Sequence, residues 1–289
     1  MRSSVVVALT SQLLPDLEPL PGAAWRAVKR LSESEIVPTA RYRLPGVDSN
    51  LIQQRLERLD EYEERLNRLS EIGITIVTEF EPDYPQRWIN RLGDRTASHL
   101  FVAGNPTLLN RSAVGVVGSR DLDSSGMSFC REVARDASKL GHAVISGGAK
   151  GADEIAMREA LEVEGYAVGI LADSLIKQLK KWDLDSGNLC LATPFAPDTG
   201  FQVGNAMARN KLVYAGSIAT VVVSSAFEAG GTWAGATEAL RMKLCPVLVR
   251  RTAMEGNQAL LAKGGIPIDK SNDLRRILDT AAPEQGRLL

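Results

Sequence analysis

The sequence has few of the residues that most often carry catalysis or hold a metal. Its 289 residues include two histidines and three cysteines, and aromatic residues make up 5% of the chain. No Ser-His-Asp order, metal-ligand pair or HExxH helix can be assembled from them. Cys130, Cys190 and Cys245 are widely spaced, so we expect free, buried thiols in a reducing cytoplasm. The sequence therefore predicts no catalytic residue set, no metal and no cofactor.

Long apolar runs and an excess of either charge are also missing. No run approaches the roughly 18 apolar residues of a membrane span, and the apolar run near the N-terminus is too short for a signal peptide. The 34 basic and 35 acidic residues give a formal net charge of −1. Because no global basic surface indicates a nucleic-acid partner, any anion site must be a local patch. We expect a cytoplasmic protein without membrane contact.

From residue 112 onward, short apolar strand patterns alternate with helix patterns. Strands are expected over residues 113–117, 143–146, 167–171, 189–192, 219–224 and 246–249. Helices are expected over residues 125–140, 153–164, 203–214 and 233–242. Near-continuous apolar strands indicate a sheet that is covered on both faces. The alternation predicts an α/β fold, a Rossmann-like, doubly wound and mostly parallel sheet, over residues 71–280. Residues 281–289 are expected to form a flexible tail.

The pattern of residues 1–70 differs from this alternation and predicts short helices separated by prolines. The clearest helix is expected over residues 51–69, where leucine and isoleucine recur at three- and four-residue steps. We expect this helix to pack on its own domain, because under three heptads is too short to argue a coiled coil. The pattern predicts a small accessory helical domain at the N-terminus.

The first of three small-residue turns, Gly118-Ser119-Arg120, follows the expected strand 113–117. It matches neither the dinucleotide fingerprint nor the Walker pattern. A strand that ends in small residues before a helix can hold an anion at the positive end of the helix dipole. Arg120 adds a planar guanidinium that suits phosphate. A phosphate contact is therefore favoured over a tight turn with a solvated arginine.

The second turn begins at Ser146 and continues through Gly147 and Gly148 to Lys150. Its run of small residues lets a polyanion approach the backbone closely, and the lysine adds a point charge. Asp153 stands where a helix is expected to begin. We interpret it as a structural N-cap that fixes the loop rather than as a catalytic group.

Two further segments complete the candidate site. Gly230-Gly231-Thr232 follows the expected strand 219–224 and enters another helix. Arg209-Asn210-Lys211 lies in the expected helix 203–214, before that strand. Arg209 and Lys211 diverge by about 200° around the helix, so at least one is expected to be a surface cation. Trp233 is placed to stack on a base, although core packing is at least as good an explanation.

These turns, in this order, resemble the DNA-processing protein A (DprA/Smf) family. The family pattern runs through G-S-R, S-G-L-A-R-G-x-D, R-N-[RK] and S-G-[ST], and the four segments above stand in those places. The likeness covers roughly residues 70–268, and its specificity comes from the ordered set of motifs. It implies a single-stranded DNA-binding protein that protects incoming strands and helps to load a RecA-type recombinase during transformation. It also implies a homodimer formed through the Rossmann-like domain.

The resemblance assigns the contacts residue by residue. It places Arg120, Lys150, Asn210 and Lys211 against DNA phosphates, with backbone or hydroxyl contacts from Ser119, Gly147, Gly148, Gly231 and Thr232. The sequence departs from the family at Lys150, where arginine is usual, and at Ala206-Met207, where the family has F-P. No winged-helix pattern follows Ile268, so functions of such a domain are not expected.

Two other functions remain open at this point. One is a nucleotide-sensing Rossmann-like module in a defence or stress system. The other is a nucleoside-monophosphate phosphoribohydrolase, whose P-G-G-x-G-T-x-x-E pattern would require Glu238 as its carboxylate. Here that carboxylate is displaced from the glycine pair at residues 230–231.

Overall fold

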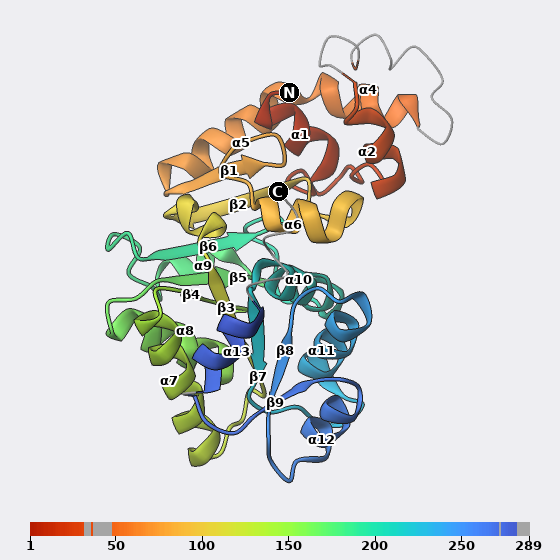
Figure 1. Cartoon of the computed structure of the whole chain (residues 1–289). Helices are drawn as coiled ribbons and strands as arrows, with labels where there is room; N and C mark the ends of the chain where they lie inside the picture. The colour runs from red at the N-terminus through yellow and green to blue at the C-terminus, as the bar shows by residue number, and fades with distance from the viewer. Residues whose placement is uncertain (32–35, 37–47, 272, 282–289) are drawn as a thin grey trace.

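The computed structural model describes residues 1–31, 36, 48–271 and 273–281, and its central feature is one mixed β-sheet (Figure 1). The strands are β1 (Ile74–Thr78), β2 (His99–Gly104), β3 (Ala113–Val117), β4 (Ala143–Ser146), β5 (Ala167–Ile170), β6 (Leu189–Thr193), β7 (Ala219–Val222), β8 (Val247–Arg250) and β9 (Ile266–Ile268). Within the described residues they form a nine-stranded sheet in the order β1-β2-β6-β5-β4-β3-β7-β8-β9. The seven strands from β6 to β9 are parallel, whereas β2 pairs antiparallel with both β1 and β6.

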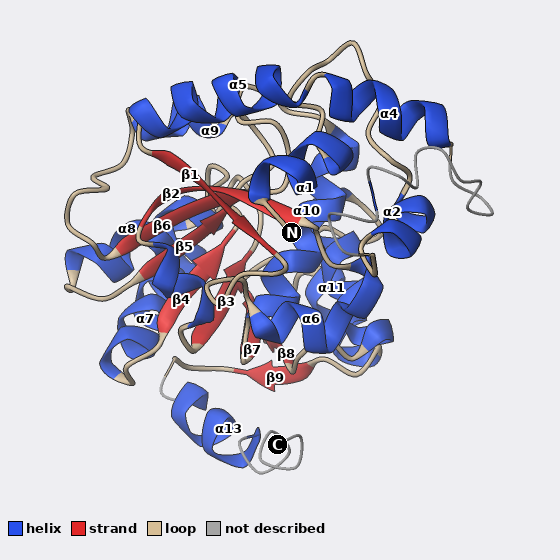
Figure 2. Ribbon diagram, turned by 90° about the horizontal axis from the view of Figure 1, so that it is seen from above, coloured by secondary structure: helices blue, strands red, loops and turns tan. Residues whose placement is uncertain are grey.

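Helices cover both faces of this sheet, as Figure 2 shows. The helices are α1 (Ser3–Thr10), α2 (Gly22–Val28), α4 (Ser49–Glu57), α5 (Leu59–Glu71), α6 (Gln86–Leu92), α7 (Ser124–Lys139), α8 (Ala152–Glu162), α9 (Leu175–Leu179), α10 (Val203–Gly216), α11 (Gly230–Met242), α12 (Glu255–Ala262) and α13 (Asp273–Ala281), with 3₁₀ turns η1 (Gly93–Arg95) and η2 (Pro106–Asn110). Helices α7, α8 and α13 pack on one face, and α6, α10, α11 and α12 pack on the other. This is the predicted Rossmann-like α/β fold.

Strand β3 shows why the parallel strands read as continuous apolar runs. Val114 and Val116 belong to the core under α7 and α8, whereas Ala113 and Val117 belong to the core under α10 and α11. Successive side chains of a strand point to opposite faces, so a strand that is covered on both sides must be apolar at every position. The three cysteines are likewise buried and free, as expected, and burial raises the pKa of each thiol.

The N-terminal helices pack on the β1–β2 end of the sheet (Figure 1). Val7 of α1 and Tyr62 of α5 share one hydrophobic cluster with Phe101 of β2 and Leu189 of β6. The prediction of a single helix over residues 51–69 is wrong. Two helices, α4 and α5, are separated at Arg58, whose backbone leaves the helical region (φ −103°, ψ 20°). The Arg58 guanidinium binds Asp16 and Glu61 at this break. Whether residues 1–70 form a domain of their own stays a prediction.

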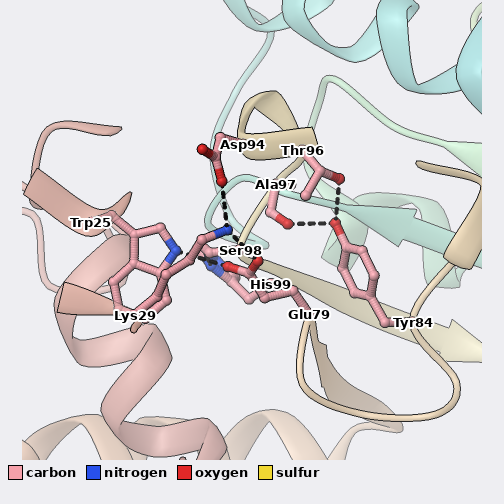
Figure 3. A network of polar contacts seen from close by, with 9 residues as sticks. All are labelled: Trp25, Lys29, Glu79, Tyr84, Asp94, Thr96, Ala97, Ser98 and His99. Carbon is pink, nitrogen blue, oxygen red and sulfur yellow. Dashed lines mark hydrogen bonds and ion pairs between the residues drawn. The ribbon is translucent and has the colours of Figure 1, made fainter. Parts of the chain in front are cut away.

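A partly buried polar network ties α2 to the segments beside β1 and β2 (Figure 3). Glu79 accepts hydrogen bonds from Trp25 Nε1 and from Lys29 Nζ, each at 2.8 Å. Lys29 also pairs with Asp94 at 3.3 Å. Within the described residues, none of the helices has the length and apolar character to cross a bilayer. The expected tail at residues 281–289 lies almost wholly outside the described residues.

Candidate nucleic-acid interface

The small-residue turns meet at one place, beyond the carboxyl ends of the parallel strands. From β3 the chain passes through α7 to β4 on one side, while β7 lies on the other side of β3. Such a switch in strand order opens a crevice at the carboxyl edge of the sheet, where ligands bind in open α/β folds. Here the crevice is a cavity of about 1140 Å³. All but two of the predicted contact residues line it: Gly118, Ser119, Arg120, Gly147, Gly148, Lys150, Arg209, Asn210, Gly230, Gly231 and Thr232.

The two remaining residues, Ser146 and Lys211, do not line the cavity. Ser146 is fully buried, and its hydroxyl donates to the carbonyl of Val116 at 2.5 Å, which joins β4 to β3. Lys211 pairs with Glu238 at 3.1 Å. As the helical spacing predicted, Arg209 and Lys211 point to different surroundings. Glu238, the carboxylate that a phosphoribohydrolase would require, also lies outside the residues that line the cavity.

Hydrogen bonds between the turns hold the cavity together. The backbone N–H of Ser119 donates to Ser224 Oγ at 3.0 Å, and the hydroxyl of Thr232 donates to the carbonyl of Gly118 at 3.0 Å. The side-chain amide of Asn210 donates to the carbonyl of Gly231 at 3.0 Å. The amide of Ser119 and the hydroxyl proton of Thr232 are therefore already used within the protein. A ligand can still take the hydroxyl proton of Ser119, whose oxygen accepts from the backbone of Asp121.

Glycine is required where the first two turns touch. Gly151 has φ +92°, and a side chain there would meet the carbonyl oxygens of Ser119 and Arg120 at 2.5 Å. Gly151 is also the N-cap of α8, which corrects the prediction that Asp153 caps this helix. Asp153 lies one residue inside α8, where its carboxylate interacts with the backbone of Ala149 in the loop and faces Arg209 of α10, with Nη1 and Oδ2 3.6 Å apart.

Arg209 and Asp153 form a buried charged pair at the floor of the cavity. They are 6% and 8% exposed, and both line the cavity. Burial raises the pKa of Asp153, and the positive charge of Arg209 opposes that shift. Burial lowers the pKa of Arg209, and the charge of Asp153 opposes that shift. Each group needs the other, because an unpaired buried charge is far costlier than a paired one.

The cations at the rim of the cavity differ from the buried Arg209 because they are exposed to solvent. Arg120, Lys150 and Lys181 line the cavity and are exposed, and none has a carboxylate partner among the described residues. Glu228 and Asp173 also line the cavity, so the rim is not uniformly basic. Helix α11 begins at Gly230, three residues before its predicted start, and its N-cap Ala229 offers no side-chain cap. Its first-turn amides therefore add positive potential to the cavity wall.

An exposed apolar strip, which no pattern in the sequence predicts, borders the same cavity. Phe201, Val203 and Met207 line the cavity and are 53%, 68% and 51% exposed. The Arg120 guanidinium lies 5.3 Å from the centre of the Phe201 ring. Phe201 stands in an irregular loop, where no periodicity marks its exposure. Trp233, the predicted stacking residue, also lines the cavity, but it packs against the core and edge-on to Phe227.

A doubly wound, mostly parallel sheet with a cavity at its switch point defines the Rossmann-like class of α/β proteins. Within it, the chain belongs to the family of DNA recombination-mediator protein A, whose sequence profile matches residues 75–279. The DNA processing protein DprA of Bacillus subtilis is 25% identical over 166 residues, which are 55% of this chain and 55% of that protein. The chain thus spans about half the length of that curated relative.

Two solved structures share the fold. The DNA processing protein A of Streptococcus pneumoniae superposes with a TM-score of 0.73 at 16% identity, over 96% of this chain and 98% of that one. The DNA processing protein A of Helicobacter pylori gives 0.60 at 23% identity, over 73% of this chain and 96% of that one. At these identities the likeness concerns the fold alone.

Proposed function

We propose that this protein binds single-stranded DNA in the cavity at the carboxyl edge of the sheet and does not cleave it. The observation that carries the proposal is that three small-residue turns converge on one cavity together with Arg120, Lys150 and Lys181. These three cations are exposed to solvent and have no carboxylate partner among the described residues. Such cations attract phosphates without first losing an internal ion pair. The structure of the H. pylori relative, which concerns its binding of single-stranded DNA, supports the same ligand here.

The apolar strip favours a single strand over a duplex. Bases that are free of pairing stack on exposed aromatic and apolar side chains, whereas a duplex hides its bases. Phe201 carries a cation on its ring and offers a stacking face beside the phosphate-binding rim. Family membership further supports protection of incoming strands, loading of a RecA-type recombinase, a cytoplasmic site of action and a homodimer.

The test is a titration of a labelled oligonucleotide at two salt concentrations, followed by fluorescence anisotropy. Arg120→Ala and Lys150→Ala should each weaken binding of all sequences alike. Each should also reduce the slope of log K against log salt by between about 0.7 and 1 per lost phosphate contact. Excess mononucleotide should compete weakly, because it offers one phosphate group in place of a strand.

Lys139→Ala is the matched control. Lys139 is an exposed cation at the C-terminal end of α7, and it does not line the cavity. Its removal should leave both affinity and salt slope within error of the wild type. If Arg120→Ala and Lys150→Ala behave like the control, DNA does not bind in this cavity. Saturable binding of a mononucleotide without any affinity for oligonucleotides would replace the proposal with a nucleotide sensor.

A further inference from the structure

The floor of the cavity holds hydrogen-bonding groups that the protein itself does not use. Arg209 is 6% exposed, yet its Nε has no hydrogen-bond partner within the described residues. Its nearest carboxylate oxygen, on Asp153, is 3.6 Å away, which is longer than a hydrogen bond. The buried hydroxyl of Tyr214, five residues along α10, also lines the cavity and has no partner in the described part of the chain. Buried donors left unused in this way indicate a missing partner.

A phosphate is a poor partner for this floor. An anion in contact with Arg209 would lie beside the carboxylate of Asp153, in a region that both residues' burial shows to be poorly solvated. Repulsion between two anions is strong where solvent is scarce. A phosphate would also lose its own hydration there, whereas the exposed cations Arg120 and Lys150 can bind it at the rim. The two levels of the cavity therefore suit different parts of a nucleotide.

The floor instead presents a neutral pair, a guanidinium that donates beside a carboxylate that accepts. We propose that the floor receives one nucleobase of the bound strand, and that Arg209 and Asp153 select guanine. Guanine carries an acceptor, O6, next to two donors, N1–H and the N2 amine. Arg209 can donate to O6, while the two guanine donors reach the carboxylate of Asp153. Thymine and inosine offer one donor to a carboxylate, and adenine and cytosine offer only their amine. Guanine therefore makes the most hydrogen bonds to Arg209 and Asp153 together.

This inference rests on the proposed function, because the base must arrive as part of a bound strand. The first experiment changes only the ligand and uses the wild-type protein. Three thymidine oligomers of about 15 nucleotides, a length that matches common single-strand site sizes, carry guanine, inosine or thymine at the central position. The guanine oligomer should bind about tenfold more tightly than the all-thymine oligomer, as one bidentate base contact allows, and the inosine oligomer, which lacks the N2 amine, should lose this advantage.

The second experiment uses Asp153→Asn, which keeps the shape of the side chain and removes its charge. The variant should lose the preference for guanine: its affinities for the guanine and all-thymine oligomers, compared within the variant itself, should become equal. If the variant binds every oligomer more tightly and equally, the floor holds a phosphate and the inference is overturned. Equal wild-type affinity for all three oligomers overturns the base assignment and leaves the proposed function standing. If no oligomer binds at all, both fail.

Discussion

At the scale of single residues, Gly147 makes room for the buried charges of the site. A Cβ atom at this position would overlap the guanidinium of Arg209 and would approach Oδ2 of Asp153 to 2.5 Å. The backbone of Gly147 does not need glycine for its torsion angle, since its φ is not positive. The missing side chain is what the site requires, because the space belongs to Arg209.

We therefore expect Gly147→Ala to displace Arg209 and to lower the free energy of unfolding by about 3 kcal/mol or more, the cost of breaking a buried ion pair. Gly204→Ala is the control, since a Cβ atom there meets nothing within 4 Å and the residue lies in the first turn of α10. That change should alter stability by less than about 1 kcal/mol. Urea denaturation of both variants measures the difference, and equal stability would show that Arg209 can move aside without cost.

The sequence could predict which residues gather at the site but not how Arg209 is used. Helical spacing separates Arg209 from Lys211, and the structure confirms that separation. The partner of Arg209 is Asp153, which lies in a different helix, and only the packing of α8 against the sheet brings the two together. A local pattern indicates a cap at Asp153, because an acidic residue near a helix start usually has that role. In the structure Gly151 is the N-cap, and Asp153 pairs with Arg209.

At the scale of elements, one buried side chain joins three parts of the C-terminal half of the sheet. Asn257 of α12 accepts a hydrogen bond from the backbone N–H of Ser225 at 2.8 Å. Its amide donates to the carbonyls of Val223 and Arg250, at 3.2 and 2.8 Å. The loop after β7 forms a wall of the cavity, so Asn257 fixes that wall to β8 and α12.

Asn257→Leu keeps the size of the side chain and removes the partner of three backbone groups, two at buried contacts and one at a part-buried contact. Because each buried group left without a partner costs about 1–3 kcal/mol, the free energy of unfolding should fall by at least about 2 kcal/mol. The neighbouring change Gln258→Ala is the control, since Gln258 is exposed and makes one long hydrogen bond to Thr252. Chemical denaturation should separate the two variants clearly. Similar stabilities would mean that water replaces the amide.

Elements of the parallel core could be predicted because each carries its own pattern. An apolar run that is covered on both faces marks β3 through β8, and the observed bounds differ from the expected ones by one or two residues at most. The start of α11 was placed too late because Gly230 and Gly231 have low helix propensity. Helix α11 begins there nonetheless, where its uncapped first turn faces the cavity.

At the scale of the whole molecule, His99 links the N-terminal helices to the sheet. It is buried in β2, where its Nδ1 lies 3.0 Å from the Thr10 hydroxyl of α1 and its ring meets Phe101 edge-on. Thr10 donates its proton to the carbonyl of Val6, so its oxygen can act only as an acceptor towards Nδ1 of His99, and the Ser98 hydroxyl lies 3.1 Å from the same nitrogen. Nε2 is buried without a partner within the described residues. The sequence could not predict this link, since it depends on β2 entering the sheet antiparallel between β1 and β6.

Protonation of His99 would place an N–H on Nε2 where nothing in the described structure accepts it, and burial lowers the pKa of this histidine to about 4. The unfolded chain, with its histidine near the ordinary value of about 6.5, binds the proton more readily, so stability falls as the pH drops from about 6.5 towards 4. Above that window His99 is neutral in both states and contributes no pH dependence. The loss attributable to His99 should approach about 3 kcal/mol at the acid end of the window.

His99→Asn retains a donor towards Thr10 and cannot titrate, so its free energy of unfolding should depend less steeply on pH than that of the wild type. The slope of stability against pH, measured by urea denaturation, is the readout, because it is independent of any constant loss from the smaller side chain. Parallel slopes in the two proteins would mean that the ring is solvated and that the N-terminal helices do not seal it.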